Sequence, residues 1–232
     1  TGILTLTGAN SYIGGTTVLA GTLRGNSVAA NAFGTGRITL GQAAVGTDPG
    51  GTADASLLIG TTGLTYSNAI ELAQGHSGIL TLGNTGTNIS TTFSGGVTGN
   101  NRLTINNNAG TGTITFNTSA INNLGTLTHI GTGTGITTIS AGIGGNVTEV
   151  IQNSGSAVLT ISGALTVASG GKILTNNVGG INVNGGVAGS GSLVLNNNAA
   201  TPTLVLQTGA INHAGTITNS RSEERRVGKE CL

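Results

Sequence analysis

The chain has 232 residues, of which 43 are Gly, while only 6% are charged and 2% are aromatic. An ordinary soluble domain is about 25% charged, so hydroxyl and amide groups must solvate most of this surface. The formal net charge is +1, and basic residues this sparse exclude a nucleic-acid partner held by phosphate contacts. The apolar fraction of 36% is too high for a disordered Gly/Ser linker. The composition therefore predicts an ordered fold with a core of small and branched aliphatic residues.

The last twelve residues differ from the rest of the chain. Residues 221–232 hold seven of the fifteen charged side chains and the single cysteine, Cys231. Residues 221–231 resemble the in-frame translation of a short-read sequencing adapter, so we expect an artefactual, unstructured tail and leave it out of the fold prediction. The alternative is a charged, solvated C-terminal tail. Residues 1–220 then form one segment without cysteine, which needs no disulfide and no thiol chemistry.

The remaining segment carries no targeting signal that we can identify. The chain begins at Thr1 and has no basic region followed by a short apolar region, so no signal peptide is expected within it. No apolar run approaches the roughly 18 residues of a membrane helix, and we expect no direct membrane insertion. We interpret the sequence as an internal fragment of a longer protein.

Alternation of apolar and polar residues predicts short β-strands. Leu4 and Leu6 share one face of a strand while Thr5 and Thr7 share the other, and residues 79–82 repeat the pattern. Period 2 bounded by Gly and Asn is typical of strands, and Gly interrupts nearly every stretch that could form a helix. Ten residues that follow the pattern are predicted to point into the core: Leu4, Leu6, Leu80, Leu82, Leu103, Ile105, Leu159, Ile161, Leu193 and Leu195.

An internal duplication favours a solenoid over a two-sheet sandwich. Residues 95–128 and 185–218 match at a constant offset of 90 positions, including the Asn triplets at 106–108 and 196–198. Self-similarity at a fixed period indicates a repeat architecture. We predict an all-β fold, a right-handed, single-stranded parallel β-helix of about ten coils with roughly 20–25 residues per coil. The Asn triplets are expected to form amide ladders at turns, and Leu103 and Leu193 to occupy equivalent sites on different coils.

Ionisable residues are too few and too scattered to indicate a catalytic, metal or cofactor site. Residues 1–220 hold four acids and three histidines, which are Asp48, Asp54, Glu71, Glu149, His76, His129 and His213. General acid–base catalysis usually needs a pair of positioned titratable groups. Asp48 and Asp54, the only acids close in sequence, flank a Pro-Gly-Gly turn and are expected in a surface loop.

The other ionisable residues are interpreted structurally. Glu71 is expected to point outward from a strand into solvent, and His213, which replaces Asn123 in the duplication, to occupy a polar turn position. No two histidines have the spacing of metal ligands. We therefore predict that the chain is not an enzyme and has no cofactor, and we assign no catalytic, cofactor-binding or metal-binding residue.

Thr-x-Thr pairs are the one pattern that indicates binding. They occur at positions 5/7, 111/113, 126/128, 132/134 and 216/218. Stacked in register they would form a flat face of hydroxyl and methyl groups, as on ice-binding β-solenoids. The alternative is that Thr is simply a polar residue well suited to strands, and the spacing between pairs varies.

Residues 2–23 read Gly-Ile-Leu-Thr-Leu-Thr-Gly-Ala-Asn-Ser-Tyr-Ile-Gly-Gly-Thr-Thr-Val-Leu-Ala-Gly-Thr-Leu. This order of a Leu/Thr strand, a Gly-Ala-Asn-x-Tyr-x-Gly-Gly-Thr-Thr turn and a Gly-Thr-Leu strand resembles the autotransporter-associated β-strand repeat, also called the passenger-associated transport repeat. The resemblance covers about a tenth of the chain. It implies a long passenger exported through the outer membrane of a Gram-negative bacterium by a C-terminal β-barrel. The repeat would then assist folding or transport, and the passenger would be extracellular or at the cell surface.

Our leading functional prediction is a non-catalytic segment of an autotransporter- or adhesin-like surface protein, a stalk or passenger scaffold that aids secretion and display. The candidate partners are the outer-membrane barrel of the same parent chain and surface glycans. One alternative is a β-solenoid module that binds carbohydrate, a surface or ice, with a ligand that the sequence does not identify. Another is the scaffold of a polysaccharide-active enzyme whose site lies outside this fragment.

Overall fold

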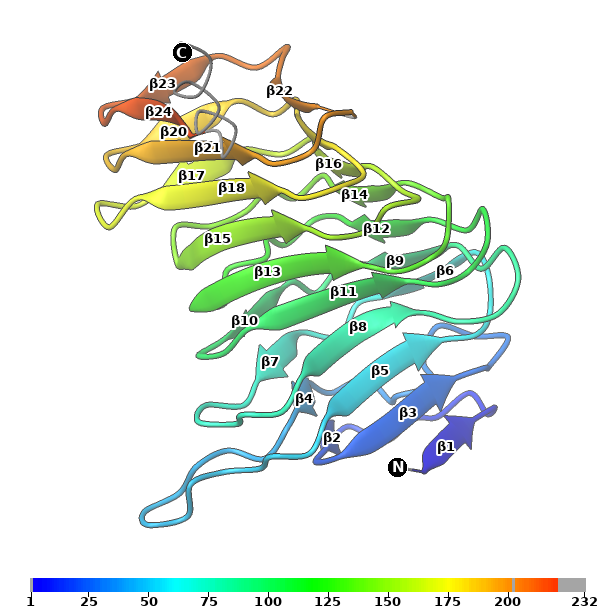
Figure 1. Ribbon diagram of the computed structural model, residues 1–232. Coiled ribbons are helices and arrows are strands. Elements are labelled where there is room, and N and C mark those ends of the chain that lie inside the picture. The colour runs from blue at the N-terminus through cyan, green and yellow to red at the C-terminus, as the bar shows by residue number, and fades with distance from the viewer. Residues whose placement is uncertain (1, 202, 221–232) are drawn as a thin grey trace, which may run out of the picture.

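A computed structural model describes residues 2–201 and 203–220. Within these ranges the chain forms twenty-four β-strands and no helix. The strands make three walls that wind around one axis, and consecutive coils stack along that axis (Figure 1). The predicted parallel β-helix is confirmed, while its right-handed sense stays a prediction. The tail at 221–232 lies outside the described residues.

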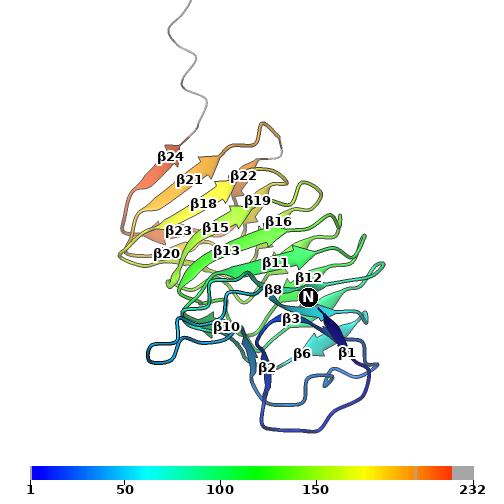
Figure 2. The ribbon, with the colours of Figure 1, turned by 60° about the horizontal axis from the view of Figure 1, so that its bottom comes forward.

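The first wall is a ten-stranded sheet in which every neighbouring pair is parallel. Its ten strands mark nine turns and the start of another, close to the ten coils expected. Their order along the axis is the order of the chain (Figure 2). The strands are β1 (Ile3–Leu6), β3 (Gly21–Gly25), β5 (Ala55–Ile59), β8 (Leu80–Asn84), β11 (Leu103–Asn107), β13 (Gly125–Ile130), β15 (Val147–Gln152), β18 (Lys172–Asn176), β21 (Leu193–Asn197) and β24 (Ile217–Ser220).

The second wall is a seven-stranded parallel sheet of short strands. Its strands are β6 (Leu64–Tyr66), β9 (Thr91–Phe93), β12 (Ile114–Phe116), β14 (Thr137–Ile139), β16 (Leu159–Ile161), β19 (Ile181–Val183) and β22 (Leu204–Leu206). Each has three residues with an outward residue in the middle, because the two flanking positions point into the core.

The third wall consists of two sheets joined by single bridges through Ile121 and Ile143. Its strands are β2 (Thr16–Val18), β4 (Ile38–Leu40), β7 (Ile70–Leu72) and β10 (Val97–Gly99), followed beyond the bridges by β17 (Leu165–Val167), β20 (Val187–Gly189) and β23 (Ile211–His213). Gly21 pairs with Ala55, so the coil between them takes 34 residues, because a long loop over residues 41–54 follows β4.

The core confirms most of the predicted inward positions. Seven of the ten are at most 1% exposed, namely Leu80, Leu82, Leu103, Ile105, Leu159, Ile161 and Leu193. Leu6 and Leu195 are partly buried and pack against them. The prediction for Leu4 is wrong, because its side chain is 62% exposed. Leu4 lies on β1, which has a neighbouring strand on one side only.

The outward positions follow the same alternation with one departure. Thr5 is exposed, as predicted for the polar face. Thr81 is only 8% exposed, although it lies between the two inward leucines of β8. It pairs with Ser56 and Thr104 on the neighbouring strands, so it belongs to the outer face, where surrounding side chains cover it.

Four of the five aromatic residues stack inside the solenoid. Phe33 contacts Tyr66, Tyr66 contacts Phe93, and Phe93 contacts Phe116, with ring centroids 5.4, 6.3 and 5.3 Å apart. The last three rings end successive strands of the second wall. Phe33 comes from a loop and fills the corresponding place in the coil that has no second-wall strand. Two of these ring pairs are tilted and the third is stacked, and such aromatic contacts stabilise the first coils.

The 90-residue offset corresponds to four coils on two of the walls. On the second wall, Ile114 is linked to Leu204 through four successive pairs. On the third wall, the same number of steps links Val97 to Val187.

The first wall departs from this register. Leu103 and Leu193 are both fully buried first residues of their strands, but the row that contains Leu103 reaches Leu195 four coils later, not Leu193. The expectation that Leu103 and Leu193 are equivalent therefore fails by two residues. The pairing of β13 with β15 contains a register shift, which contributes to this offset.

The expected amide ladder forms at the second Asn triplet, whereas the triplet at 106–108 makes no amide-to-amide side-chain bond among the described residues. The side chain of Asn177 donates to Asn153 and that of Asn198 donates to Asn177, both at 2.7 Å, so three exposed amides stack on successive coils. Inside the same corner, the amide of Asn107 donates to the carbonyls of Gly112 and Gly135. These bonds satisfy turn carbonyls that the parallel sheets leave unpaired.

Candidate functional site

The four acidic side chains within the described part of the chain lie in different surroundings. Asp48 accepts hydrogen bonds from Gln42 and from the backbone of Gly50 within the long loop, as predicted for a surface turn. Asp54 accepts from the backbone N–H of Ile79 at 2.8 Å. Each carboxylate therefore holds a turn in place.

The two remaining acids face outward from strands. Glu71 lies on the third wall and forms an ion pair with Arg37 at 2.7 Å, so the expectation that it is merely solvated is incomplete. Glu149 lies on the first wall and accepts from the hydroxyl of Thr175 at 2.6 Å. Among the described residues, no group of three His, Cys, Asp or Glu side chains is placed to hold a metal ion.

His213 is the last residue of β23 and not a turn residue, so the turn position expected from the duplication is wrong, although its contact matches that of its counterpart. Its Nε2 lies 3.3 Å from the carbonyl oxygen of Thr216, three residues further on. Asn123, its counterpart, reaches the carbonyl of Thr126 at the same separation, at 3.4 Å. The two side chains therefore contact matching carbonyls.

His129 is fully buried inside the first wall. Its Nδ1 lies 2.8 Å from Oε1 of Gln152 on the next strand. Burial lowers the pKa of His129 to about 4, while the hydrogen bond with Gln152 opposes the shift. The neutral imidazole therefore serves as a core residue, enclosed between Ile105 and Gln152.

Lys172 is a buried cation with no carboxylate partner among the described residues. Its side chain is 1% exposed, and its Nζ donates to the carbonyls of Gly144 and Val147. Burial lowers the pKa of Lys172 to about 8. The ammonium caps two carbonyls of the preceding coil and is enclosed by the chain, so it is not available to a substrate.

The Thr-x-Thr pairs do not stack into one array. Thr126 and Thr128 of β13 pair with Glu149 and Ile151 on the next strand, and Thr111 and Thr132 instead bond to Asn88 and Asn108 at the corners. The flat face that these pairs would form if stacked in register is therefore absent from the described residues, which favours the alternative that Thr is simply well suited to strands.

A different row of threonines runs across the strands of the second wall. It consists of the middle residues of five successive strands, Thr65, Thr92, Thr115, Thr138 and Thr160, which pair directly with one another. Asn182 and Val205 continue the row. The search for Thr-x-Thr pairs missed this row because each coil contributes a single threonine to it.

A groove on the outer face of the first wall is the best candidate for a binding site, and we call it the outer groove. Its volume is about 360 Å³. Its lining residues are His76, Ser77, Gly78, Ile79, Leu80, Asn101, Arg102, Thr104, Thr126, Thr128 and Ile151. They come from the turns before β8 and β11 and from the outward positions of three strands. The lining contains one permanent cation, Arg102, and no carboxylate.

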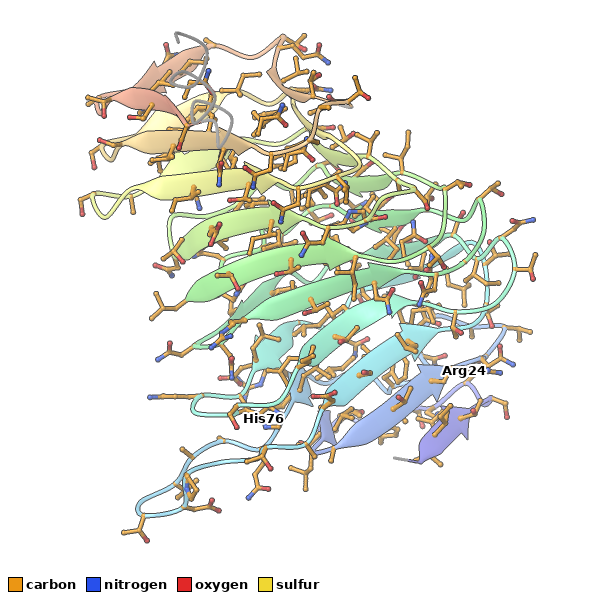
Figure 3. The ribbon with its side chains drawn as sticks, in the orientation of Figure 1. Arg24 and His76 are labelled. Atoms are coloured by element: carbon orange, nitrogen blue, oxygen red, sulfur yellow. The ribbon has the colours of Figure 1, made fainter. Side chains whose placement is uncertain are left out.

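His76 lines the outer groove from the turn that precedes β8 (Figure 3). The ring is 4% exposed, and its Nδ1 accepts a hydrogen bond from the backbone N–H of Gln42 at 3.1 Å. Its Nε2 is buried and has no hydrogen-bond partner among the described residues. Arg24, whose Nε is also buried without a partner, lies on β3 away from this groove (Figure 3).

Asn101 fixes the groove wall between two coils. Its amide donates to the carbonyls of Ala73 and His76, at 2.9 and 2.6 Å. Its own side-chain oxygen accepts from the backbone N–H of Arg102 at 2.8 Å. The amide thus holds the two turns of the groove together and positions the start of β11.

No helix among the described residues is long and apolar enough to cross a membrane.

The comparisons with known proteins identify one short region. The sequence model of the passenger-associated transport repeat matches residues 1–24. No curated protein and no solved structure matches the chain. The matched region, whose described part includes β1, β2 and the beginning of β3, is therefore similar to a passenger-associated transport repeat and continues into a parallel β-solenoid.

Proposed function

We propose that the chain is a non-catalytic scaffold of an autotransporter-type passenger, which supports secretion and displays the passenger at the cell surface. The observation that carries the proposal is the direct continuation of the transport repeat at 1–24 into an unbroken parallel solenoid. The two share one sheet, since β1 and β3 of the repeat begin the first wall.

The topology suits a chain that must fold as it emerges. Each strand of a wall pairs only with the strands one coil before and one coil after it. In such a solenoid, folding can start at one place and propagate to neighbouring coils. A passenger that leaves the cell as an extended chain can therefore add one coil at a time, and each added coil buries the apolar face of the last.

The distribution of titratable groups supports a structural role. Asp54 and Glu149 are each engaged in a separate hydrogen bond, and Glu71 is engaged in an ion pair. A hydrolase or lyase would need at least one titratable group aimed at a substrate site. The outer groove holds His76 but no acid. Purified protein is therefore expected to leave polysaccharides uncleaved, and turnover that Asp54→Asn abolishes would contradict the non-catalytic assignment.

Secretion can be tested by placing residues 1–220 between a signal sequence and the translocator of a Gram-negative autotransporter. Deletion of residues 2–23 removes the transport repeat, and we expect surface display, measured by antibody binding to intact cells, to fall several-fold. The matched control deletes residues 150–173, one whole coil between the register partners Val150 and Leu174. The control should reduce display much less, since neighbouring coils can stack again. Equal losses in both variants would contradict a specific role of the repeat.

A further inference from the structure

We propose that the outer groove binds a carboxylate-bearing sugar, with Arg102 as the contact for the carboxylate. The inference goes beyond the scaffold role, because a scaffold needs no ligand. It rests on the coil geometry, on polar groups that the fold leaves unpaired and on the chemistry of the lining.

The stacking of successive coils brings the lining residues together. His76 and Asn101 lie in the turns before β8 and β11, Thr126 and Ile151 lie on β13 and β15, and all four line the groove. The β-ladders place Thr104 beside Thr128, and Thr128 beside Ile151. Residues spread over 76 positions therefore form one continuous surface across four coils.

The groove presents polar groups that the protein itself does not use. The guanidinium of Arg102 and the hydroxyls of Thr104 and Thr128 make no hydrogen bond or ion pair within the described residues. They differ in this from Thr175, whose hydroxyl binds Glu149. An unpaired donor set beside a cation is available to a ligand that carries several oxygen atoms.

His76 adds a donor without a partner to the lining of the groove. Since Nδ1 accepts the N–H of Gln42, Nε2 is the nitrogen left to donate. It is buried and has no acceptor among the described residues, and an unsatisfied buried donor is destabilising. A ligand oxygen that reached Nε2 would supply the missing acceptor.

The lining selects the class of ligand. Two acids adjoin the lining, but Asp54 is engaged by the N–H of Ile79 and Glu149 by the hydroxyl of Thr175. Arg102 is the one charged side chain of the lining itself, and its planar guanidinium matches a carboxylate in a bidentate arrangement. Threonine hydroxyls match sugar hydroxyls, and the aliphatic side chains of Ile79 and Ile151 offer apolar contact for the C–H face of a sugar ring. The volume of about 360 Å³ lies at the small end of ligand sites, which fits one sugar unit better than a long oligosaccharide.

The test is a titration of the full chain with sodium D-galacturonate, followed by calorimetry. We expect saturable binding with a dissociation constant in the millimolar range. The methyl ester of the same sugar and D-galactose keep the hydroxyls but lack the charge, and should bind about tenfold more weakly or not at all. Acetate keeps the charge but lacks the hydroxyls, and should also bind more weakly than galacturonate.

Variants locate the site. Arg102→Gln should weaken galacturonate binding about tenfold, and Thr104→Val and Thr128→Val, which keep the strand shape, should each weaken it by a smaller factor. The control is Arg37→Gln, which removes an exposed cation paired with Glu71 on the third wall and should leave binding unchanged. In ¹⁵N spectra of the imidazole, the Nε2 resonance of His76 should shift on saturation.

Three results would overturn the proposal: no saturable binding of galacturonate, binding that Arg102→Gln leaves intact, or acetate binding as tight as galacturonate. The last would assign the groove to carboxylates in general, such as those of acidic peptides. Surface display should be the same for Arg102→Gln as for the unaltered chain, so a failure here is separate from a failure of the scaffold proposal.

Discussion

The same four residues, Ile-Leu-Thr-Leu, occur at 3–6 and at 79–82, and the structure treats them differently. Leu4 of the first copy is 62% exposed, whereas Leu80 of the second is 1% exposed. The second copy lies on a strand that pairs on both sides, with β5 and with β11. The first lies on β1, which pairs only with β3. Local sequence decides which side chains face inward, but burial requires neighbouring coils.

The duplicated segments teach the same lesson. Ile121 is fully buried and Ile211, 90 positions later, is 44% exposed. Ile121 has a bridge partner on both sides, Val97 and Ile143, while Ile211 lies on β23, the last strand of its wall. The same residue type therefore stabilises the fold by different amounts, and the amount depends on the distance of the residue from the ends of the described solenoid.

The largest expected difference is between alanine variants of Leu80 and Leu4, which hold the same position in the two copies of Ile-Leu-Thr-Leu. Leu80→Ala should reduce the free energy of unfolding by about 2–5 kcal/mol, because it leaves a cavity in a closed core. Leu4→Ala should cost about 0.5 kcal/mol or less, because the side chain is mostly exposed. Urea denaturation of both variants measures the difference. Equal losses of unfolding free energy would mean that β1 is covered in solution. They would contradict the claim that burial requires neighbouring coils on both sides.

Acid should destabilise the central coils through His129. The pKa of this residue is lowered to about 4 from 6.5, so the unfolded chain binds the proton first as the pH falls. Stability from this group is complete above pH 6.5 and is lost between pH 6.5 and 4, with a total of about 3 kcal/mol.

The contribution of His129 can be isolated by comparing the unaltered chain with His129→Gln. The variant keeps a polar side chain beside Gln152 but cannot titrate, so its unfolding free energy should change less over that pH range. Parallel pH profiles for the two proteins would show that this ring is solvated in solution.

A smaller difference in stability is expected between two Gly→Ala variants, one in a central coil and one at the first coil. Gly131 has a φ of +125°, and a Cβ there would lie 2.1 Å from the carbonyl oxygen of Asn107 on the preceding coil. Gly131→Ala should therefore cost roughly 1–3 kcal/mol. Gly2→Ala meets no atom within 4 Å and should change the melting temperature very little. A well-tolerated alanine at 131 would show that coils in the centre can shift apart.

Much of the fold could be predicted because the alternation of Leu103 with Ile105, and of Leu159 with Ile161, is a local pattern. The parallel solenoid was predictable from the duplication, since a fixed offset implies stacked units. The error at Leu4 arose because a pattern carries no information about neighbouring strands. The two-residue discrepancy between Leu103 and Leu193 arose because sequence alignment does not detect changes of register between strands.

The outer groove could not be predicted from the sequence, for a related reason. The strands that line it are separated by coils of 23, 24 and 23 residues, whereas the coil between Gly21 and Ala55 takes 34 residues. Without the lengths of the individual coils, no single spacing could be singled out. The role of Phe33 in the aromatic stack was also hidden, because it lies in a loop and not on a predicted strand.

The most direct test of the account is amide hydrogen exchange, resolved by residue, under native conditions. If burial comes from stacked coils, the amides of β11 and β13 should exchange slowest, with opening free energies close to that of global unfolding. Those of β1 and β24, each with one neighbouring strand, should exchange fastest among the ten strands of the first wall. Uniform protection along that wall, or protection of β1 equal to that of β11, would contradict the claim that neighbouring coils bury this core.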